Sequence, residues 1–383
     1  MKVTQISIGR FHHFHLARQL ERFDLLQTIY TGYPKFKLKN EFGIPNSRIK
    51  TFPWIHAPYM KRGAIYLNRF SWLNKEWEWI DKQSLDKFVS RNISHPTILI
   101  ALSGSGLSSG LKNQILGGKY ICDRGSSHIR FQNEILEEEY RIWGYKFKGI
   151  DPRVIEKEEK EYDASNQITV PSEFVKQSFI SMGVPATKLN KIPYGANLER
   201  FKKLLKTPSD KFRILWVGNV SIRKGFLYAL EAFQNFKHPL KEFIVIGNLE
   251  NEVRYLIKNR NLTHVKFLGT VPNSKLSEFY STAHVFVLSS IEEGLAMVIG
   301  EALACGCPVI ASTNTGAHDL VNDEVEGFIV PIRSADAILE KFEILAADKM
   351  IYESMSNAAI LRVEKLGGWN TYGNCFKNLI SKL

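Results

Sequence analysis

The chain has 383 residues, of which 44% are hydrophobic and 23% are charged, and its formal net charge at pH 7 is +12. These proportions exclude a disordered chain, and the length favours two domains because a single core stops growing at roughly 250–300 residues. The N-terminus lacks the apolar core of a signal peptide, and no stretch approaches the roughly 20 apolar residues of a membrane-spanning helix, so we expect a cytoplasmic protein.

Positive charge is concentrated near the N-terminus. Before residue 76 the chain has 13 basic and only 3 acidic residues. The basic and aromatic residues of this region include Lys35, Lys37, Lys39, Arg48, Lys50, Lys61, Arg62, Arg69, Trp54, Tyr59, Tyr66 and Trp72. Such a mixture suits an anionic membrane surface and also suits nucleic acid. A basic surface without a dedicated partner explains it equally well.

Short strand-like runs recur in two series, separated by helical patterns. Most are apolar at consecutive positions, which is typical of strands buried on both faces of a parallel sheet. The runs are residues 3–9, 25–32, 97–103, 119–125 and 167–172, then 213–218, 242–248, 265–269, 284–290, 308–313 and 327–330. They predict two doubly wound, Rossmann-like α/β domains, residues 1–195 and 196–383, that face each other across a ligand-binding cleft.

Two adjacent cations, Arg223 and Lys224, follow the first strand of the second series. That strand is expected to end at Gly218, and a helix is expected to begin near Phe226. Cations beside a helix N-terminus at the carboxyl end of a parallel strand suit a phosphate group. From position alone, a solvated pair of side chains in a loop is an equally good interpretation.

The stretch EEGLAMVIGE, residues 292–301, follows the strand-like run 284–290. Gly294 permits a close backbone approach, and a helix is expected from about Ala296 to a glycine cap at Gly306. Free backbone N–H groups at the start of this helix would form an anion site. The residues that would supply them are Leu295, Ala296 and Met297.

Two glutamates of this stretch are candidates for binding hydroxyl groups. Glu293 precedes the expected helix and Glu301 lies within it, so both can face one cleft. Ionised carboxylates accept hydrogen bonds from sugar hydroxyls. The simpler alternative is one acid that favours the helix dipole and one exposed glutamate. We favour the binding interpretation because Glu301 lies between VIG and ALA, where an exposed side chain is not expected.

Taken together, these motifs resemble a known family. The pattern E-G-x6-E followed by ALACGCPVIAS resembles the signature of family 4 retaining glycosyltransferases, which have the GT-B fold. GNVSIRKG resembles the family's Arg-Lys phosphate motif, and residues 170–201 and 314–330 resemble its inter-domain segment and the stretch after the second glutamate. The resemblance is strong from about residue 165 to 335 and weak before it.

The resemblance implies a UDP- or GDP-sugar donor held mainly by the C-terminal domain, and a product that keeps the donor's anomeric configuration. Arg223 and Lys224 would neutralise the leaving diphosphate, Glu293 would contact the donor sugar near the reacting carbon, and Glu301 would bind the ribose. Neither a metal ion nor another cofactor is expected. The implied donor-binding residues are Gly218, Phe267, Leu268, Gly294, Leu295, Ala296, Met297 and Glu301, with Phe267 and Leu268 near the base.

The N-terminal domain departs from the family pattern. Its first loop, beginning Gly9-Arg10, has one glycine where the family commonly has several, and it would face the acceptor or donor sugar. The family often places a histidine at the end of an N-domain strand. The corresponding strand here ends CDRGSSH, so Asp123 is a catalytic candidate and Arg124 and His128 are candidates for the donor-sugar side. A turn-forming role for Asp123 is equally compatible.

Three further features have alternative interpretations. The histidines His12, His13 and His15 suggest a metal site only weakly, and a polar loop at the cleft mouth is favoured. The apolar stripe of the last helix, about residues 367–383, packs back onto the first domain in the resembling family, but a surface helix on the second domain is also compatible. Residues 50–95 are interpreted as an insertion or an acceptor-side element.

The sequence therefore predicts a retaining glycosyltransferase that moves a sugar from a nucleotide-sugar to a glycan or lipid-linked acceptor, in the synthesis of surface polysaccharide or lipopolysaccharide. We expect it in the cytoplasm, with peripheral attachment to the inner face of the membrane as an option. One alternative is another two-domain sugar-phosphate enzyme, such as an epimerase or a phosphorylase. A non-catalytic nucleic-acid binder is disfavoured by the Arg223–Lys224 and Glu293–Glu301 motifs, and nucleic acid is not an expected partner.

Overall fold

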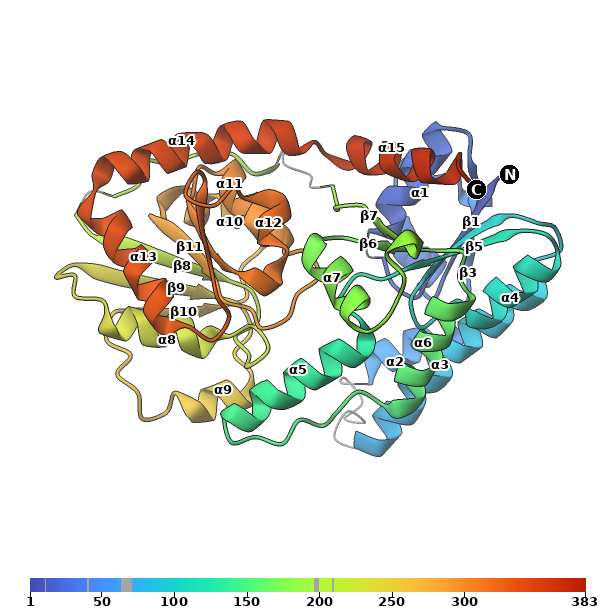
Figure 1. Ribbon diagram of the computed structural model, residues 1–383, viewed down its shortest axis with the longest axis horizontal. Helices are drawn as coiled ribbons and strands as arrows, with labels where there is room; N and C mark the ends of the chain where they lie inside the picture. Colours follow the sequence, from blue (N-terminus) through green and yellow to red (C-terminus); the bar gives the residue numbers. More distant parts are fainter. Residues whose placement is uncertain (11, 40, 63–70, 196–199, 209) are drawn as a thin grey trace.

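The computed structural model describes residues 1–383 except 11, 40, 63–70, 196–199 and 209. Two α/β domains lie side by side along the long axis of the molecule (Figure 1). The predicted pair of doubly wound domains is thereby confirmed. The predicted boundary at residue 196, and Tyr66 and Arg69 of the basic region, lie outside the described residues.

The N-terminal domain contains a parallel sheet of seven strands in the order β3-β2-β1-β4-β5-β6-β7. Its strands are β1 (Val3–Ser7), β2 (Leu26–Thr31), β3 (Ile49–Thr51), β4 (Ile98–Leu102), β5 (Lys119–Asp123), β6 (Gln167–Val170) and β7 (Leu189–Lys191). Its helices are α1 (His13–Arg22), α2 (Pro53–Lys61), α3 (Ser71–Asn92), α4 (Leu107–Ile115), α5 (Ile129–Ile142), α6 (Pro152–Ala164) and α7 (Glu173–Ser181). The three-residue strands β3 and β7 were not predicted.

The C-terminal domain contains a parallel sheet of six strands in the order β10-β9-β8-β11-β12-β13. Its strands are β8 (Phe212–Val217), β9 (Lys241–Ile246), β10 (Val265–Gly269), β11 (Val285–Leu288), β12 (Val309–Ser312) and β13 (Gly327–Val330). The helices that follow β8 are α8 (Phe226–Asn235), α9 (Asn251–Leu256), α10 (Asn273–Thr282), α11 (Met297–Ala304), α12 (Ala317–Leu320), α13 (Ala335–Ala347), α14 (Lys349–Leu366) and α15 (Trp369–Ile380).

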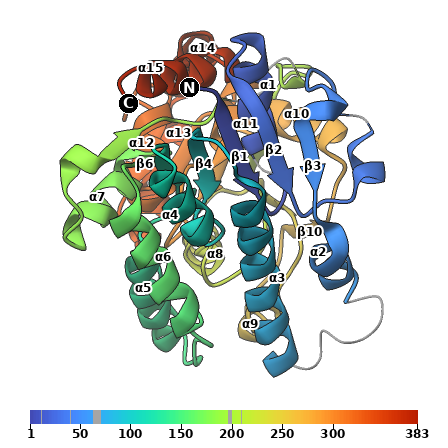
Figure 2. The same ribbon diagram turned by 90° about the vertical axis from the view of Figure 1, so that its right-hand side faces the viewer.

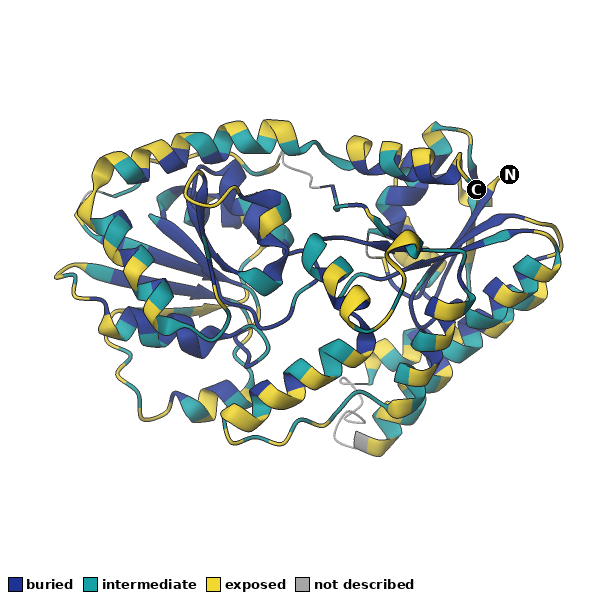
Figure 3. Cartoon of the chain, in the orientation of Figure 1, coloured by how far each residue is buried: buried dark blue, intermediate teal, exposed yellow. Residues whose placement is uncertain are grey.

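Helices cover both faces of the C-terminal sheet, which explains its unbroken apolar strands. In β11, Val287 belongs to the core under α8 and α13, whereas its neighbour Phe286 packs with Tyr280 of α10 and Ile299 of α11 on the opposite face. All four residues of β11 are buried. The same layering is visible in Figure 3, where buried strands lie between helices whose outer faces are exposed. Consecutive apolar residues are what a strand between two helical layers requires.

The final helix returns to the N-terminal domain. Helix α14 runs along the C-terminal domain, and α15 then packs against α1, as Figures 1 and 2 both show. Tyr372 and Phe376 of α15 are buried in the same core as Phe14 of α1. The rings of His15 and Trp369 stack with their centroids 3.8 Å apart. The stripe of α15 therefore forms part of the N-terminal core.

The loops that follow the neighbouring strands β8 and β11 lie beside the domain interface. Strand β8 pairs with β9 on one side and with β11 on the other, so the strand order reverses between β8 and β11. Ligands of doubly wound sheets bind beyond the carboxyl ends of the strands at such a point.

Among the described helices, none has both the length and the apolar character needed to cross a bilayer.

Candidate functional site

The loops that follow β8 and β11 meet at the reversal point of the C-terminal sheet. The N–H of Ile291 donates to the carbonyl of Arg223 over 2.9 Å. Gly225, which precedes α8, has a φ of +67°, and a Cβ there would lie 1.9 Å from the carbonyl oxygen of Ser289. Only glycine fits that position. The two loops are therefore packed backbone to backbone, and their side chains are fixed relative to each other.

Two ion pairs join these loops. The Nζ of Lys224 contacts Oε2 of Glu293, and a guanidinium nitrogen of Arg223 lies 2.8 Å from Oε2 of Glu292. The Lys224 and Glu293 side chains remain 21% and 19% exposed, whereas the Glu292 side chain is 0% exposed. The predicted cations and Glu293 are thus brought together in one place, with Lys224 and Glu293 accessible to a ligand.

Gly294 lets this turn contact the N-terminal domain. A Cβ on Gly294 would lie 1.8 Å from the carbonyl oxygen of Gly125, in the loop after β5. The hydroxyl of Ser172 donates to the carbonyl of Gly294 over 2.6 Å. The close approach expected of this glycine is therefore one between domains, and it places the Glu293 turn at the domain interface.

The predicted cradle of backbone N–H groups is wrong at Ala296. The Ala296 N–H donates to the carbonyl of Thr315 over 3.1 Å, and the N–H of Glu293 donates to Asn314 over 3.0 Å. These bonds fix the turn to the segment after β12, so neither group is free for an anion. Leu295 and Met297 remain the candidates for such a contact.

Glu301 faces a pocket between the two domains. Its Oε2 accepts a hydrogen bond from the Tyr280 hydroxyl over 3.2 Å, and burial raises the pKa of Glu301 above its ordinary value. The pocket has a volume of about 1010 Å³. Its lining combines predicted residues of both domains with others: Arg10, His15, Arg18, Gln19, Glu41, Phe42, Arg200, Phe201, Asn273, Ser274, Met297, Glu301 and Trp369.

Asp123 is buried and already engaged by protein groups. Its carboxylate accepts a hydrogen bond from Thr169 over 2.6 Å, and its Oδ2 lies 2.5 Å from Nε2 of His12 and 2.9 Å from Nε2 of His13. Burial alone would raise the pKa of Asp123, but the two histidines lower it well below its usual range. In the described structure the Asp123 carboxylate is thus held by Thr169, His12 and His13, and its catalytic role stays a prediction.

The histidine cluster is divided by the structure. His12 and His13 lie beside Asp123, and the three candidate ligand atoms are within 4.8 Å of one another, whereas His15 stacks on Trp369. A zinc ion about 2.0–2.2 Å from each ligand would hold those atoms roughly 3 Å apart or more. The direct contact between His12 and Asp123 is shorter than that, so in the described structure these side chains contact each other directly instead of spanning an ion.

Arg124 and His128, the candidates for the donor-sugar side, are both buried. The buried guanidinium of Arg124 pairs with Glu158 over 2.7 Å. His128 caps α5 by accepting a hydrogen bond from the N–H of Arg130, and its ring packs 5.0 Å from that of Phe179. Both side chains are used inside the N-terminal domain, because the loop after β5 turns inward there.

The residues predicted near the base are placed differently from one another. The ring of Phe267 packs 5.9 Å from that of Phe226 against the core, whereas Leu268 lines a groove beside Glu278 of α10. Their proximity to the base of a nucleotide stays a prediction. Gly218 has a φ of +141° at the end of β8, and the carbonyl of Gly9 accepts a hydrogen bond from Ser7.

Glu292 is a buried residue of the turn after β11 that was not among the predicted site residues. Its carboxylate accepts hydrogen bonds from Ser126, Ser127 and Gln132 of the N-terminal domain as well as from Arg223. The sequence contains one indication of this role. Glu292 directly follows the run Ser289-Ser290-Ile291, which is buried, and a buried acid needs hydrogen-bonding or charged partners.

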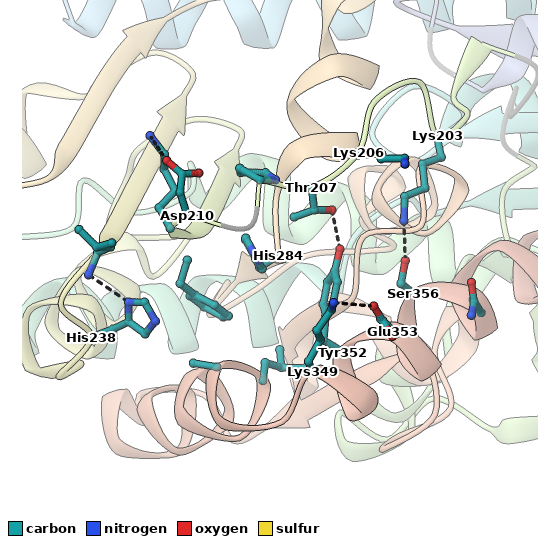
Figure 4. A pocket seen from close by; sticks show the side chains of 17 residues that line it. Lys203, Lys206, Thr207, Asp210, His238, His284, Lys349, Tyr352, Glu353 and Ser356 are labelled. Atoms are coloured by element: carbon teal, nitrogen blue, oxygen red, sulfur yellow. Dashed lines mark hydrogen bonds and ion pairs between the residues drawn. The ribbon is translucent and has the colours of Figure 1, made fainter.

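A second pocket lies in the C-terminal domain, with a volume of about 820 Å³ (Figure 4). It opens at the amino ends of the strands, beside Phe212 and His284. Within it Lys203 donates to Ser356 over 3.0 Å, and the hydroxyls of Thr207 and Tyr352 are 2.6 Å apart. Ligands of doubly wound sheets bind beyond the carboxyl ends of the strands, so the pocket beside Glu301 is the better candidate site.

Part of the chain matches a known protein family. Residues 198–362 match the family model of glycosyl transferases group 1. The matched segment is less than half of the chain, and it contains Arg223, Lys224, Glu292, Glu293 and Glu301. The ion-pair loops and the pocket acid therefore lie in the part of the chain that this glycosyltransferase family shares.

Solved structures extend the likeness to the whole chain at the level of the fold. The sucrose-phosphate synthase of Thermosynechococcus elongatus superposes with a TM-score of 0.73 at 20% sequence identity, covering 100% of this chain and 98% of that one. The fold is that of GT-B glycosyltransferases, as the sequence resemblance implied. The predicted fold class is confirmed.

Curated relatives are similar over part of their length. The amylovoran biosynthesis glycosyltransferase AmsK of Erwinia amylovora is 30% identical over 211 residues, which are 50% of this chain and 52% of that protein. The UDP-Gal:alpha-D-GlcNAc-diphosphoundecaprenol alpha-1,3-galactosyltransferase of Escherichia coli is 27% identical over 184 residues, 44% of this chain and 48% of that protein. The chain spans about half the length of the curated relatives it matches.

Proposed function

We propose that the protein is a retaining glycosyltransferase that moves a sugar from a UDP- or GDP-sugar to a glycan or lipid-linked acceptor in the synthesis of surface polysaccharide or lipopolysaccharide. The observation that carries the proposal is the meeting of Arg223 with Glu292 and of Lys224 with Glu293 at the reversal point of the C-terminal sheet. The family match of residues 198–362 supports it.

The geometry suits a diphosphate leaving group. Lys224 is accessible and, without a ligand, is paired with Glu293. An incoming diphosphate would take Lys224 from Glu293 and share Arg223 with Glu292, which frees the Glu293 carboxylate to face the donor sugar. The bond from the anomeric carbon to the diphosphate oxygen would then break, a bond to the acceptor hydroxyl oxygen would form, and the acceptor proton would pass to the leaving diphosphate. The two cations supply the charge that this step needs, so the proposal includes no metal ion.

Glu301 is proposed to bind the ribose of the donor. Its carboxylate lies on α11 at the inter-domain pocket, and one oxygen is held by Tyr280. An ionised carboxylate accepts hydrogen bonds from two neighbouring hydroxyls, which is the pattern that a ribose presents. Met297 lines the same pocket one turn earlier in the helix.

The acceptor is proposed to bind on the N-terminal side of the pocket, at the membrane. The name of the Escherichia coli relative describes an acceptor joined to a polyprenyl diphosphate. In the basic region of this chain, Phe36, Trp54 and Trp72 are 62%, 76% and 70% exposed. Exposed aromatic rings among lysines suit the headgroup layer of an anionic membrane, so we propose peripheral attachment at the cytoplasmic face.

The proposal is tested with a panel of UDP-, GDP-, ADP- and CDP-sugars scored by thermal shift, because a ligand that binds the native state raises its apparent stability. At least one UDP- or GDP-sugar should raise the melting temperature of the wild type. Glu301→Ala should reduce that shift, whereas Glu278→Ala, in the groove beside Leu268, should not. A wild type that responds to no member of the panel would contradict the proposal.

A further inference from the structure

Glu292 is a buried carboxylate at the domain interface that receives hydrogen bonds from both domains. Its Oε1 accepts from the Ser126 hydroxyl over 3.0 Å, from the Ser127 N–H over 3.0 Å and from the Ser127 hydroxyl over 2.7 Å. Its Oε2 accepts from the Gln132 amide over 2.9 Å. These donors belong to the loop after β5 and to α5, so they all come from the N-terminal domain.

The remaining partner of Glu292 comes from the C-terminal domain. Arg223 donates through Nε to Oε2 over 3.1 Å and to the Glu292 carbonyl over 3.2 Å, and another guanidinium nitrogen lies 2.8 Å from Oε2. Burial alone would raise the pKa of Glu292, but the charge of Arg223 and the bonds from Ser127 and Gln132 lower it to about 2. A buried carboxylate is tolerated only with such a complete set of partners.

The N-terminal donors are themselves fixed in place. Arg124 donates through Nε to the carbonyl of Ser127 over 3.0 Å and through another nitrogen to Oε1 of Gln132 over 2.9 Å. Since Arg124 is anchored on Glu158, the donors face Glu292 as one rigid group. A chain of contacts therefore runs from Glu158 to Arg124, from Arg124 to Ser127 and Gln132, and from these two residues through Glu292 to Arg223.

We infer that Glu292 is a positioning residue that ties Arg223 to the N-terminal domain, so that Arg223 takes its place in the site only when the two domains are closed. When the domains separate, Glu292 loses its donors from Ser126, Ser127 and Gln132 and gains water. Arg223 then keeps one hydrated partner and is free to change rotamer. The role of Arg223 at a diphosphate rests on the proposed function, whereas the tie between the domains does not.

The neighbouring pair provides a matched comparison. Lys224 pairs with Glu293 in the same two loops, but the Glu293 side chain is 19% exposed and its hydrogen bond in the described structure is to Lys224. Removing Lys224 changes the charge of the site by the same amount as removing Arg223. Only the loss of Arg223 leaves a buried carboxylate between the domains without its cation. The free-energy penalty of an unpaired carboxylate is far larger when it is buried than when it is exposed.

The test is small-angle X-ray scattering of the free wild-type protein and of five variants. A compact chain of this length has a radius of gyration of roughly 21 Å, and domain opening should increase it by about 1 Å or more. We expect that increase in Glu292→Gln, in Arg223→Ala and in the double variant Ser126→Ala/Ser127→Ala, while Lys224→Ala keeps the wild-type value. Glu292→Gln combined with Arg223→Ala should open the domains no further than either change alone, because the two residues act through one contact.

The serine variant keeps the test decisive if Glu292→Gln fails to fold, since it removes donors without disturbing the charged pair. Wild-type dimensions in both Arg223→Ala and the serine variant would overturn the inference, and so would equal opening by Lys224→Ala. No nucleotide is needed for this measurement. A protein that binds none of the nucleotide-sugars would therefore refute the proposed function without changing the scattering result.

Discussion

At the scale of single residues, two adjacent glutamates have opposite environments. Glu292 is 0% exposed and is surrounded by donors, whereas Glu293 is 19% exposed and contacts Lys224. The turn after β11 directs one carboxylate to the N-terminal domain and the next to Lys224. The sequence predicted Glu293 from its motif, but the partners of Glu292 lie about 160 residues earlier in the chain. Distant partners of this kind are visible only once the two loops are packed together.

A pH dependence follows from the pKa of Glu292, which is lowered from 4.5 to about 2 in the folded protein. A lowered folded-state pKa contributes stability that is full above the unfolded value of 4.5 and is lost as the pH falls towards 2. The contribution is on the order of 3 kcal/mol at neutral pH. Glu292→Gln should therefore unfold at lower urea concentration than the wild type near pH 7. The difference between the two urea midpoints should narrow below about pH 4.5. A gap that does not change with pH would contradict this explanation.

At the scale of helices and strands, the elements with longer apolar patterns were the ones predicted from the sequence. The strands of four or more residues were predicted because helices cover both of their faces, whereas β3 and β7 have three residues each and leave no readable pattern. The start of α8 was predicted correctly near Phe226, after the loop that Gly225 allows to approach β11. The apolar stripe of α15 was equally readable, but its spacing alone did not indicate which domain it covers.

The packing of α15 gives a stability prediction for this element. Phe376 is fully buried in the N-terminal core, although it lies at the end of a chain that has just crossed the C-terminal domain. Phe376→Ala should lower the free energy of unfolding by about 3–5 kcal/mol, as expected for removal of a buried aromatic side chain. Leu361→Ala, on α14 with a side chain 57% exposed, should change it by less than about 0.5 kcal/mol. Equal effects of the two changes in urea unfolding would show that α15 is not part of the core.

At the scale of the whole molecule, charged contacts join the two domains at several places. Besides Glu292, Arg333 pairs with the buried Glu139 over 2.7 Å, and Lys191 pairs with Asp319 over 2.7 Å. The sequence predicted two domains and a cleft from alternating strands and helices. It could not predict these pairs, because each joins residues more than 100 positions apart whose meeting depends on how the domains are oriented.

The uneven charge of the molecule leads to a membrane-binding prediction. The wild type should sediment with vesicles that contain phosphatidylglycerol at low salt and much less at high salt, since exposed charges are screened. Phe36→Ala/Trp54→Ala should weaken this binding by about tenfold or more. Tyr255→Ala, on α9 of the C-terminal domain with a side chain 74% exposed, should bind like the wild type. Equal sedimentation with neutral vesicles, or no loss in the double variant, would contradict the membrane proposal.

We expect a nucleotide diphosphate to bind at the loops of Arg223 and Lys224 and not in the pocket of Lys203. Calorimetric titration of UDP, GDP, ADP and CDP into Lys224→Ala and Lys203→Ala tests it most directly, since each change removes one lysine from one of the two places. We predict that the tightest nucleotide loses about tenfold or more in affinity for Lys224→Ala, and that Lys203→Ala binds it as the wild type does. Unchanged affinity in Lys224→Ala, or a loss of affinity confined to Lys203→Ala, would show that the nucleotide does not bind at the loops of Arg223 and Lys224.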